Sequence, residues 1–174
     1  MQGQRLGACS ATTRTVGTLA GVARRAEQIA DLGPERDAQL LVNAAWLHDL
    51  GYAQQLASTG FHPLDGARHV RDIGASSRLC GLVANHTASR FEAPLRGLEP
   101  VLMAEVPPEV GVLADALTYA DLTVGPDGET VSVDERLRDI WSRYPEEHVV
   151  HRATRDTAPT LRETARRPMQ ASPS

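Results

Sequence analysis

The chain has 174 residues, a length that favours one domain able to bury a sizeable core. Its formal net charge of -4 excludes the basic surface typical of nucleic-acid-binding proteins, so we expect no nucleic-acid partner. No apolar stretch approaches the roughly 18 residues that a membrane-spanning helix needs, so we expect no membrane partner. Cys9 and Cys80 stand in no metal-binding or redox spacing, which favours a reducing, cytoplasmic location.

The pattern of apolar residues is helical nearly throughout the chain. In the first half it predicts helices over about residues 15–32, 35–52, 63–74 and 76–89. Proline and glycine then predict a loop with at most one short helix over about residues 91–108. Two helices follow over about residues 109–123 and 132–144, the second opened by a capping box of Ser132 and Glu135, and a weaker helix begins near residue 146.

We found no internal repeat and no sign of a second domain. The pattern predicts a flexible N-terminal segment over residues 1–13, a helical domain over 14–166 and a polar, disordered tail over 167–174. The fold class is therefore all-α, a compact single-domain bundle of about six to seven helices.

The pentad Leu47-His48-Asp49-Leu50-Gly51 places an imidazole and a carboxylate side by side in an apolar helical run. Burying an ionised carboxylate is costly unless it is paired or bound to a metal. At 3.6 residues per turn, His48 falls within about 60° of Leu41, Ala44 and Ala45, so it is predicted to face the core. A divalent metal is the simplest partner for such a doublet.

Three further residues are predicted to point inward. Asp121 lies about 40° from Leu117, whereas Asp115 lies on the opposite side of the same helix and faces away. His86 shares a stripe with Leu82, and His62 stands just before a helix.

Each of these residues alone has a plainer interpretation. His86 would be a hydrogen-bonded core histidine, His62 a loop histidine, Asp121 a structural acid, and the doublet a buried polar pair. The convergence of all of them is what favours a metal site. Trp46 and Trp141 are expected in the core, and Tyr52 near the site.

The order of these motifs resembles that of the HD-domain superfamily of metal-dependent phosphohydrolases. The resemblance covers about residues 16–144, and it is strongest to small bacterial members with two extra histidines, similar to symmetrical dinucleoside tetraphosphate hydrolases. The stretches that carry it are Trp46-Leu47-His48-Asp49-Leu50-Gly51, Phe61-His62-Pro63-Leu64-Asp65-Gly66-Ala67, Asn85-His86-Thr87 and Tyr119-Ala120-Asp121.

The resemblance implies a helical bundle of the HD-domain type and a set of ligands. His48, Asp49 and Asp121 match positions that bind a first metal, and His62 and His86, with a bridging Asp49, match those that hold a second. Such nitrogen and oxygen ligands suit one or two divalent ions, namely Fe, Mn or Zn, with Mg also compatible. Asp49 and His48 are the expected catalytic residues.

One position departs from the family pattern. The superfamily has a further histidine on the first helix, and counting back from Val22-Ala23 places Thr18 in that slot. The slot still faces inward, because Thr18 lies about 40° from Val22. A hydroxyl is a poor ligand for a divalent ion at neutral pH, so the first metal would keep three protein ligands and activity is in doubt.

Three functions follow from the resemblance. The favoured one is a metal-dependent phosphohydrolase that uses a metal-activated water on a nucleotide or another small-molecule phosphate substrate. The alternative is a catalytically degenerate domain that binds a nucleotide or a partner without hydrolysis, and a third is a di-iron oxygenase on the same fold.

The sequence offers weak candidates for substrate binding. Arg90 can reach back one turn toward His86, although an arginine on the helix surface is an equally good interpretation. Thr123 lies near the Asp121 end of its helix and is a candidate for the mouth of the site. A homodimer is compatible with a chain of this size.

Overall fold

The computed structural model describes the backbone of residues 4–30 and 35–170 and the side chains of residues 16–30 and 37–168. The elements in these residues are all helices: α1 (Gln4–Ala30), α2 (Glu35–Leu47), η1 (Leu50–Tyr52), α3 (His62–Asp72), α4 (Ser77–Asn85), α5 (Ser89–Leu95), α6 (Glu99–Glu105), α7 (Val112–Leu122), α8 (Val133–Arg143), α9 (Val149–Asp156) and α10 (Ala158–Gln170). The all-α prediction is confirmed, with more helices than the expected six to seven.

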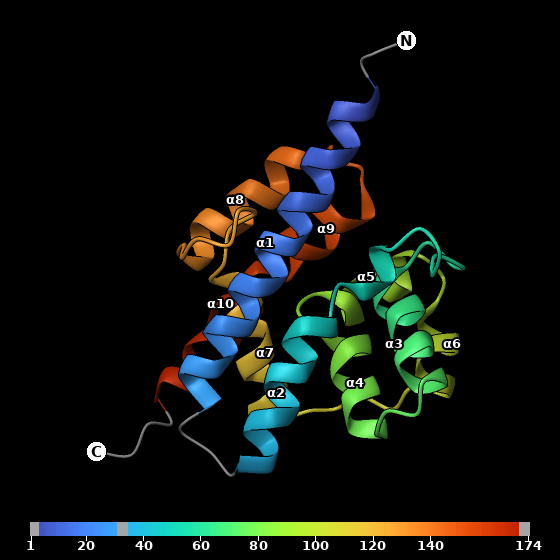
Figure 1. Ribbon diagram of the computed structural model, residues 1–174, viewed down its shortest axis with the longest axis vertical. Coiled ribbons are helices and arrows are strands. Elements are labelled where there is room, and N and C mark those ends of the chain that lie inside the picture. The colour runs from blue at the N-terminus through green and yellow to red at the C-terminus, as the bar shows by residue number, and fades with distance from the viewer. Residues whose placement is uncertain (1–3, 31–34, 171–174) are drawn as a thin grey trace.

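The long helix α1 crosses the front of the view in Figure 1, with α3, α4 and α6 to one side and α8 and α10 to the other. It packs on α2, and α7 lies against α1, α2 and α10. Small buried residues such as Ala23 and Ala26 of α1 and Ala44 and Ala45 of α2 let these helices approach closely. No helix among the described residues is both long and apolar enough to span a membrane.

A second apolar cluster attaches the C-terminal helices to the rest of the bundle. It is formed by Ala88, Leu122, Leu137, Ala158 and Leu161, with Trp141 packed against it. Burial of this surface holds α8 and α10 beside the end of α7.

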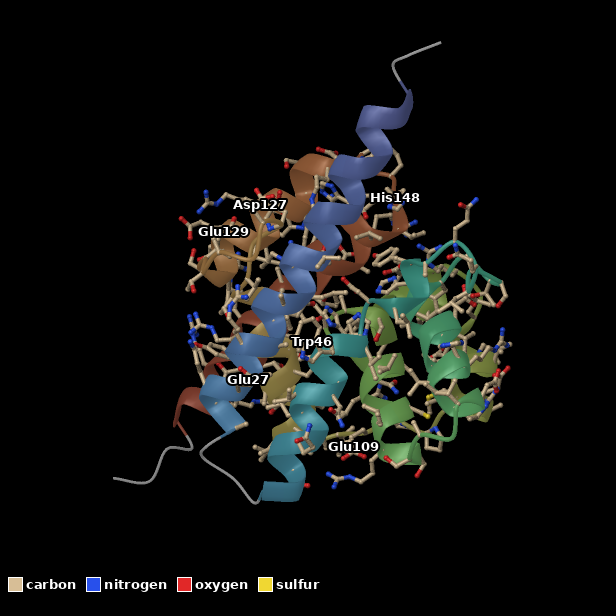
Figure 2. The ribbon with its side chains drawn as sticks, viewed as in Figure 1. Glu27, Trp46, Glu109, Asp127, Glu129 and His148 are labelled. Atoms are coloured by element: carbon tan, nitrogen blue, oxygen red, sulfur yellow. The ribbon has the colours of Figure 1, made fainter. Side chains whose placement is uncertain are left out.

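The indole of Trp141 also donates a hydrogen bond from Nε1 to Thr154 Oγ1 over 3.1 Å, which links α8 to α9. Trp46, by contrast, is 45% exposed, so its predicted place in the core is wrong (Figure 2). Trp46 is about 200° around the helix from the buried Ala44, and this turns its ring to the surface.

Several helix ends differ from the prediction. Helix α1 begins at Gln4, inside the segment expected to be flexible, and it is continuous to Ala30 because no proline interrupts it. Helix α10 continues to Gln170, past the expected start of the tail at residue 167. Residues 1–3 and 171–174 of the two expected segments lie outside the described residues.

The predicted loop over residues 91–108 contains two helices, α5 and α6, instead of one at most. Pro100 occupies the first turn of α6, where the missing N–H is not needed, and α5 ends one residue after Pro94. The weak helix expected after residue 146 is likewise two helices, α9 and α10. The predicted capping box at the start of α8 is confirmed, because Ser132 Oγ accepts from the Glu135 N–H while the Glu135 side chain bonds back.

The predicted helix over 35–52 ends early, at Leu47, and the chain turns into η1. The turn follows from a close approach of Gly51 to α3. A Cβ on Gly51 would lie 2.0 Å from the carbonyl oxygen of His62 and 2.7 Å from the backbone nitrogen of Gly66, so only glycine fits there. This contact places the residues after α2 directly against the start of α3.

Candidate metal centre

His48 lies in the turn immediately after α2 and is fully buried. Its backbone N–H still bonds to Ala44 O over 2.8 Å, so the residue continues the inward face of the helix. Its Nδ1 lies 2.8 Å from Ala45 O, and a carbonyl oxygen only accepts, so Nδ1 carries the proton. The lone pair of a neutral His48 is therefore on Nε2.

His86 is held in the same way at the end of α4. The predicted fourth helix ran through this residue, but α4 ends at Asn85 and His86 is its C-cap. Nδ1 of His86 donates to Val83 O over 2.7 Å, which again leaves the lone pair on Nε2. Backbone carbonyls that fix a histidine tautomer in this manner are common behind metal ligands.

His62 is the first residue of α3 and faces His86 across the site. The two Nε2 atoms are 3.2 Å apart. The ring of Tyr52 stacks on the ring of His62 with centroids 3.9 Å apart and fixes its orientation. Two ring nitrogens at this distance need a shared proton or a cation between them, because two lone pairs repel each other.

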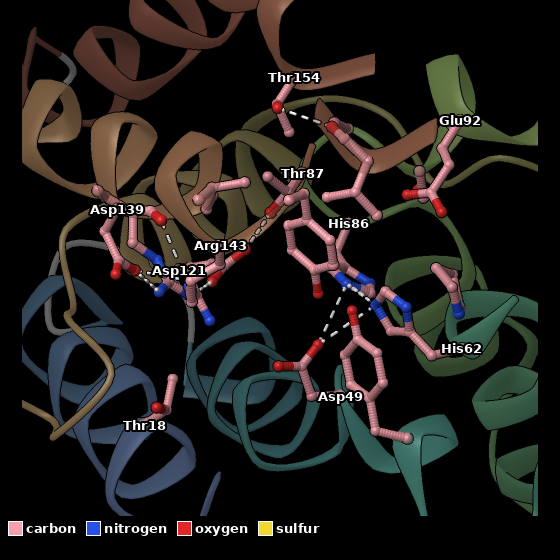
Figure 3. A pocket seen from close by; sticks show the side chains of 18 of the residues that line it. Thr18, Asp49, His62, His86, Thr87, Glu92, Asp121, Asp139, Arg143 and Thr154 are labelled. Carbon is pink, nitrogen blue, oxygen red and sulfur yellow. Dashed lines mark hydrogen bonds and ion pairs between the residues drawn. The ribbon is translucent and has the colours of Figure 1, made fainter. Parts of the chain in front are cut away.

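Asp49 is the centre of the arrangement (Figure 3). Its Oδ1 lies 3.3 Å from His62 Nε2 and 3.7 Å from His86 Nε2, and its Oδ2 lies 3.5 Å from His48 Nε2. One donor atom each from Asp49, His62 and His86 lies within 4.8 Å of the others. The structure therefore brings together a carboxylate oxygen and two imidazole nitrogens in a set that suits a divalent transition metal.

Asp121 reaches the site from the last turn of α7. Its Oδ1 lies 3.9 Å from His48 Nε2 and 3.4 Å from Arg136 Nη2, and its Oδ2 accepts a hydrogen bond from Thr87 Oγ1. Asp115, on the same helix, points away and pairs with Arg167 near the C-terminal end of α10. The helical facing angles thus separate the two carboxylates as expected.

A buried atom tests whether a cation fits this set of residues. Nε2 of His48 is buried and has no hydrogen-bond partner among the described residues. Such an atom is costly in the absence of a partner, yet it faces carboxylate oxygens of both Asp49 and Asp121. A metal ion or another cation on this side of Asp49 would satisfy it. On the other side, the facing ring nitrogens of His62 and His86 also require a cation or a shared proton, so the residues present fit a metal.

The charges of the site favour the protonation states that metal ligands need. Burial alone acts to raise the pKa of Asp49, but the charge of His48, a hydrogen bond from His62 and the charge of His86 outweigh it and hold that pKa well below its usual range. For His86, burial and then the neighbouring charges of His48 and His62 lower the pKa to about 4. At neutral pH the carboxylate is ionised and this imidazole is neutral, as metal ligation requires.

Asp49, His62, His86 and Asp121 line a pocket of about 520 Å³, and His48 lies behind them. The opposite wall of the pocket comes from α8 and α9 and includes two arginines that the sequence analysis missed, Arg136 and Arg143. Both form ion pairs with Asp139, at the i,i+3 and i,i+4 positions of α8. The sequence shows a basic residue on each side of Asp139, but the apolar face of α8 alone does not indicate where these arginines point.

Thr18, the altered ligand position, is 9% exposed and lines the same pocket. Its Oγ1 donates a hydrogen bond to Pro126 O over 2.8 Å. Arg90 is exposed on α5, and Thr123 Oγ1 donates to Tyr119 O over 2.7 Å at the end of α7. Neither of these two candidates for substrate binding is among the residues that line the pocket.

Asp65 supports the site from behind, and sequence analysis gave it no role. This buried carboxylate accepts hydrogen bonds from the backbone N–H groups of Ser58, Thr59 and Gly60 and from the hydroxyls of Ser58 and Thr59. These bonds hold the loop before α3 in place and thereby position His62. An aspartate in a first helical turn that collects backbone N–H groups is a recognisable local signal.

Comparison with known proteins gives one match. Residues 18–120 match the family model described as HD domain, a segment that begins at Thr18 and ends one residue before Asp121. No curated protein and no solved structure matches the chain. Helix α8, which carries Arg136 and Arg143, lies beyond the matched segment, as do α9 and α10.

Replacing Asp65 by asparagine tests its role in the loop. We expect Asp65→Asn to lower the free energy of unfolding by about 1–3 kcal/mol at pH 7, because several hydrogen bonds lose their charged acceptor. Burial acts to raise the pKa of Asp65, but hydrogen bonds from Ser58 and Thr59 outweigh it and hold the pKa below its usual 3.8. The stabilisation is therefore complete above pH 3.8 and is lost as the pH falls through the lower, folded-state value.

Urea unfolding of the two proteins between pH 7 and pH 3 measures this effect. The difference in free energy of unfolding between the wild type and Asp65→Asn should become smaller as the pH falls toward 3. Asp72→Asn, an exposed carboxylate at the other end of α3, is the matched control and should change stability by less than about 0.5 kcal/mol. A difference between Asp65→Asn and the wild type that stays constant with pH would show that the carboxylate charge has no part in holding the loop.

Proposed function

Because the chain belongs to the HD domain family, we propose that it is a metal-dependent phosphohydrolase acting on a nucleotide or another small phosphate ester. The family's members are generally metal-dependent phosphohydrolases. The observation that carries the proposal is the convergence of Asp49, His62 and His86 on one point at the floor of the pocket. A symmetrical dinucleoside tetraphosphate is the finer substrate suggested by the resemblance in the sequence.

The protein residues in this mechanism bind and orient. Asp49, His62 and His86, with His48 and Asp121, form the metal-binding set, and the backbone carbonyls behind His48 and His86 keep the lone pairs directed into the site. A divalent ion bound there would polarise a phosphoryl oxygen and lower the pKa of a water molecule for attack on phosphorus. Fe, Mn and Zn match the mixed nitrogen and oxygen donors best, and Mg is compatible.

The pocket above the metal set supports a small phosphate substrate. Its volume of about 520 Å³ lies within the range of small-molecule sites. Arg143 is exposed, lines the pocket and pairs with Asp139, so its guanidinium is held in place while donors remain for a phosphate. Tyr52 offers an aromatic face next to His62. We propose no nucleic-acid or membrane partner.

Release of phosphate is the direct test of the proposed function. The protein, stripped of metal with a chelator, should be inactive, and added Mn, Fe, Zn or Mg should restore phosphate release from a panel of mononucleotides and dinucleoside polyphosphates. Asp49→Asn should lower kcat/KM by more than about 100-fold, because even the outer partners of metal ligands contribute about 10–100-fold. Asp115→Asn, on α7 but paired with Arg167 outside the pocket, is the matched control and should retain activity. Equal activity of Asp49→Asn and Asp115→Asn, or no release with any ion, would contradict the proposal.

Arg143 and Arg90 form a matched pair for the phosphate contact. Arg143→Gln should raise KM about 10-fold or more with a smaller change in kcat, because it removes a charged donor from the pocket wall. Arg90→Gln removes the same charge from a residue of α5 that does not line the pocket, and it should leave KM within about 2-fold. Steady-state kinetics with the best substrate of the panel measures both. A larger effect of Arg90→Gln would mean that the substrate enters from the α5 side.

A further inference from the structure

Arg136 comes from α8 and contacts the metal-binding set directly. The residue is 8% exposed, and its Nη2 lies 3.4 Å from Asp121 Oδ1. The same carboxylate oxygen lies 3.9 Å from His48 Nε2. A guanidinium is thus paired with the oxygen that a metal between His48 and Asp121 would use. Arginine does not lose its proton in proteins, so this positive charge is permanent.

Thr18, at the first-helix ligand position, lies on the same side of Asp49 as Asp121 in Figure 3. Thr18 lines the pocket, but its hydroxyl is directed to Pro126 O. This side of Asp49 therefore presents a hydroxyl in the slot where the resembled family has an imidazole. A cation and a missing imidazole both weaken the binding of a second cation.

The other side of Asp49 carries imidazole nitrogens and no guanidinium. There Oδ1 faces two imidazole nitrogens, those of His62 and His86, at 3.3 and 3.7 Å. These three donors are the ones that lie within 4.8 Å of one another. Three protein ligands with open positions are the usual arrangement of a catalytic metal. The two sides of Asp49 are therefore unequal as metal sites.

We propose that this chain binds a single divalent ion, at Asp49, His62 and His86, and that the guanidinium of Arg136 takes the place of a second ion beside Asp121 and His48. The inference rests on the metal site of the proposed function. Arg136 then presents a fixed positive charge to the phosphate of the substrate. Arg136 lines the pocket, so its charge borders the space that the substrate phosphate would occupy.

The position of Arg136 in the fold explains how a guanidinium comes to stand where a second ion would bind. The arginine is supplied by α8, which lies beyond the segment that matches the family. The second apolar cluster, through Leu137 and Leu122, seats α8 against the end of α7 where Asp121 stands. The C-terminal helices thus provide a cation to a site whose remaining residues come from the family segment and its boundary.

Counting bound ions tests the inference without reference to hydrolysis. The chelator-stripped full chain is dialysed against Mn²⁺, and the bound metal is measured by mass spectrometry and by electron paramagnetic resonance. The wild type should bind about one ion per chain and show the spectrum of an isolated Mn²⁺. Arg136→Gln should bind about two, because His48, Asp49 and Asp121 then offer three ligands free of the guanidinium.

Two variants control for charge and position. Arg136→Lys keeps a cation beside Asp121 and should stay at about one ion per chain. Arg143→Gln removes a charge from the same helix and pocket, but one paired with Asp139 instead of Asp121, and should also stay at about one. Circular dichroism verifies that each variant is folded.

Two results would overturn the inference: an exchange-coupled pair of Mn²⁺ ions in the wild type, or a folded Arg136→Gln that still binds one ion. The wild-type spectrum decides the question even if Arg136→Gln does not fold. Two bound ions together with phosphate release would refute the single-ion site and leave the proposed function intact. One bound ion without phosphate release from any substrate would refute the proposed function and leave the single-ion site intact.

Discussion

The structure depends on one half-buried carboxylate among three imidazoles. Asp49 shares its two oxygens between His48 on one side and His62 and His86 on the other. An ionised group in such a place is stable only when positive charge surrounds it. The backbone carbonyls of Ala45 and Val83 add to this constraint, because they fix the protons on Nδ1 and turn both Nε2 lone pairs inward. The cluster is built for a cation.

Helix ends, more than helix faces, create this cluster. His48 follows the end of α2, His62 begins α3, His86 caps α4, and Asp121 stands in the last turn of α7. At helix termini the backbone turns, and side chains from different helices can converge there. The close contact of Gly51 with the start of α3 brings two of these ends together. The helices α8 and α9 then cover the cluster with a wall of charged, polar and apolar side chains and complete the pocket.

The sequence predicts the all-α fold and the inward direction of His48 because helical hydrogen bonding continues through His48 N to Ala44 O. The end of α2 at Leu47 was not predictable, since it depends on the tertiary contact between Gly51 and Gly66. Arg136 and Arg143 were missed for a similar reason. The apolar face of α8 is visible in the sequence, but the direction in which its arginines point depends on how Leu137 docks on Leu122. The exposure of Trp46 shows that apolar neighbours in the sequence do not determine whether a helical side chain faces the core or the solvent.

Diffraction from crystals soaked in Mn²⁺, recorded for its anomalous signal, tests the central claim most directly. The account predicts a peak between Asp49 Oδ1, His62 Nε2 and His86 Nε2, the three donors that already lie within 4.8 Å of one another. A protein that holds no ion there, or that holds its principal ion between His48 and Asp121 with Arg136 displaced, would contradict it.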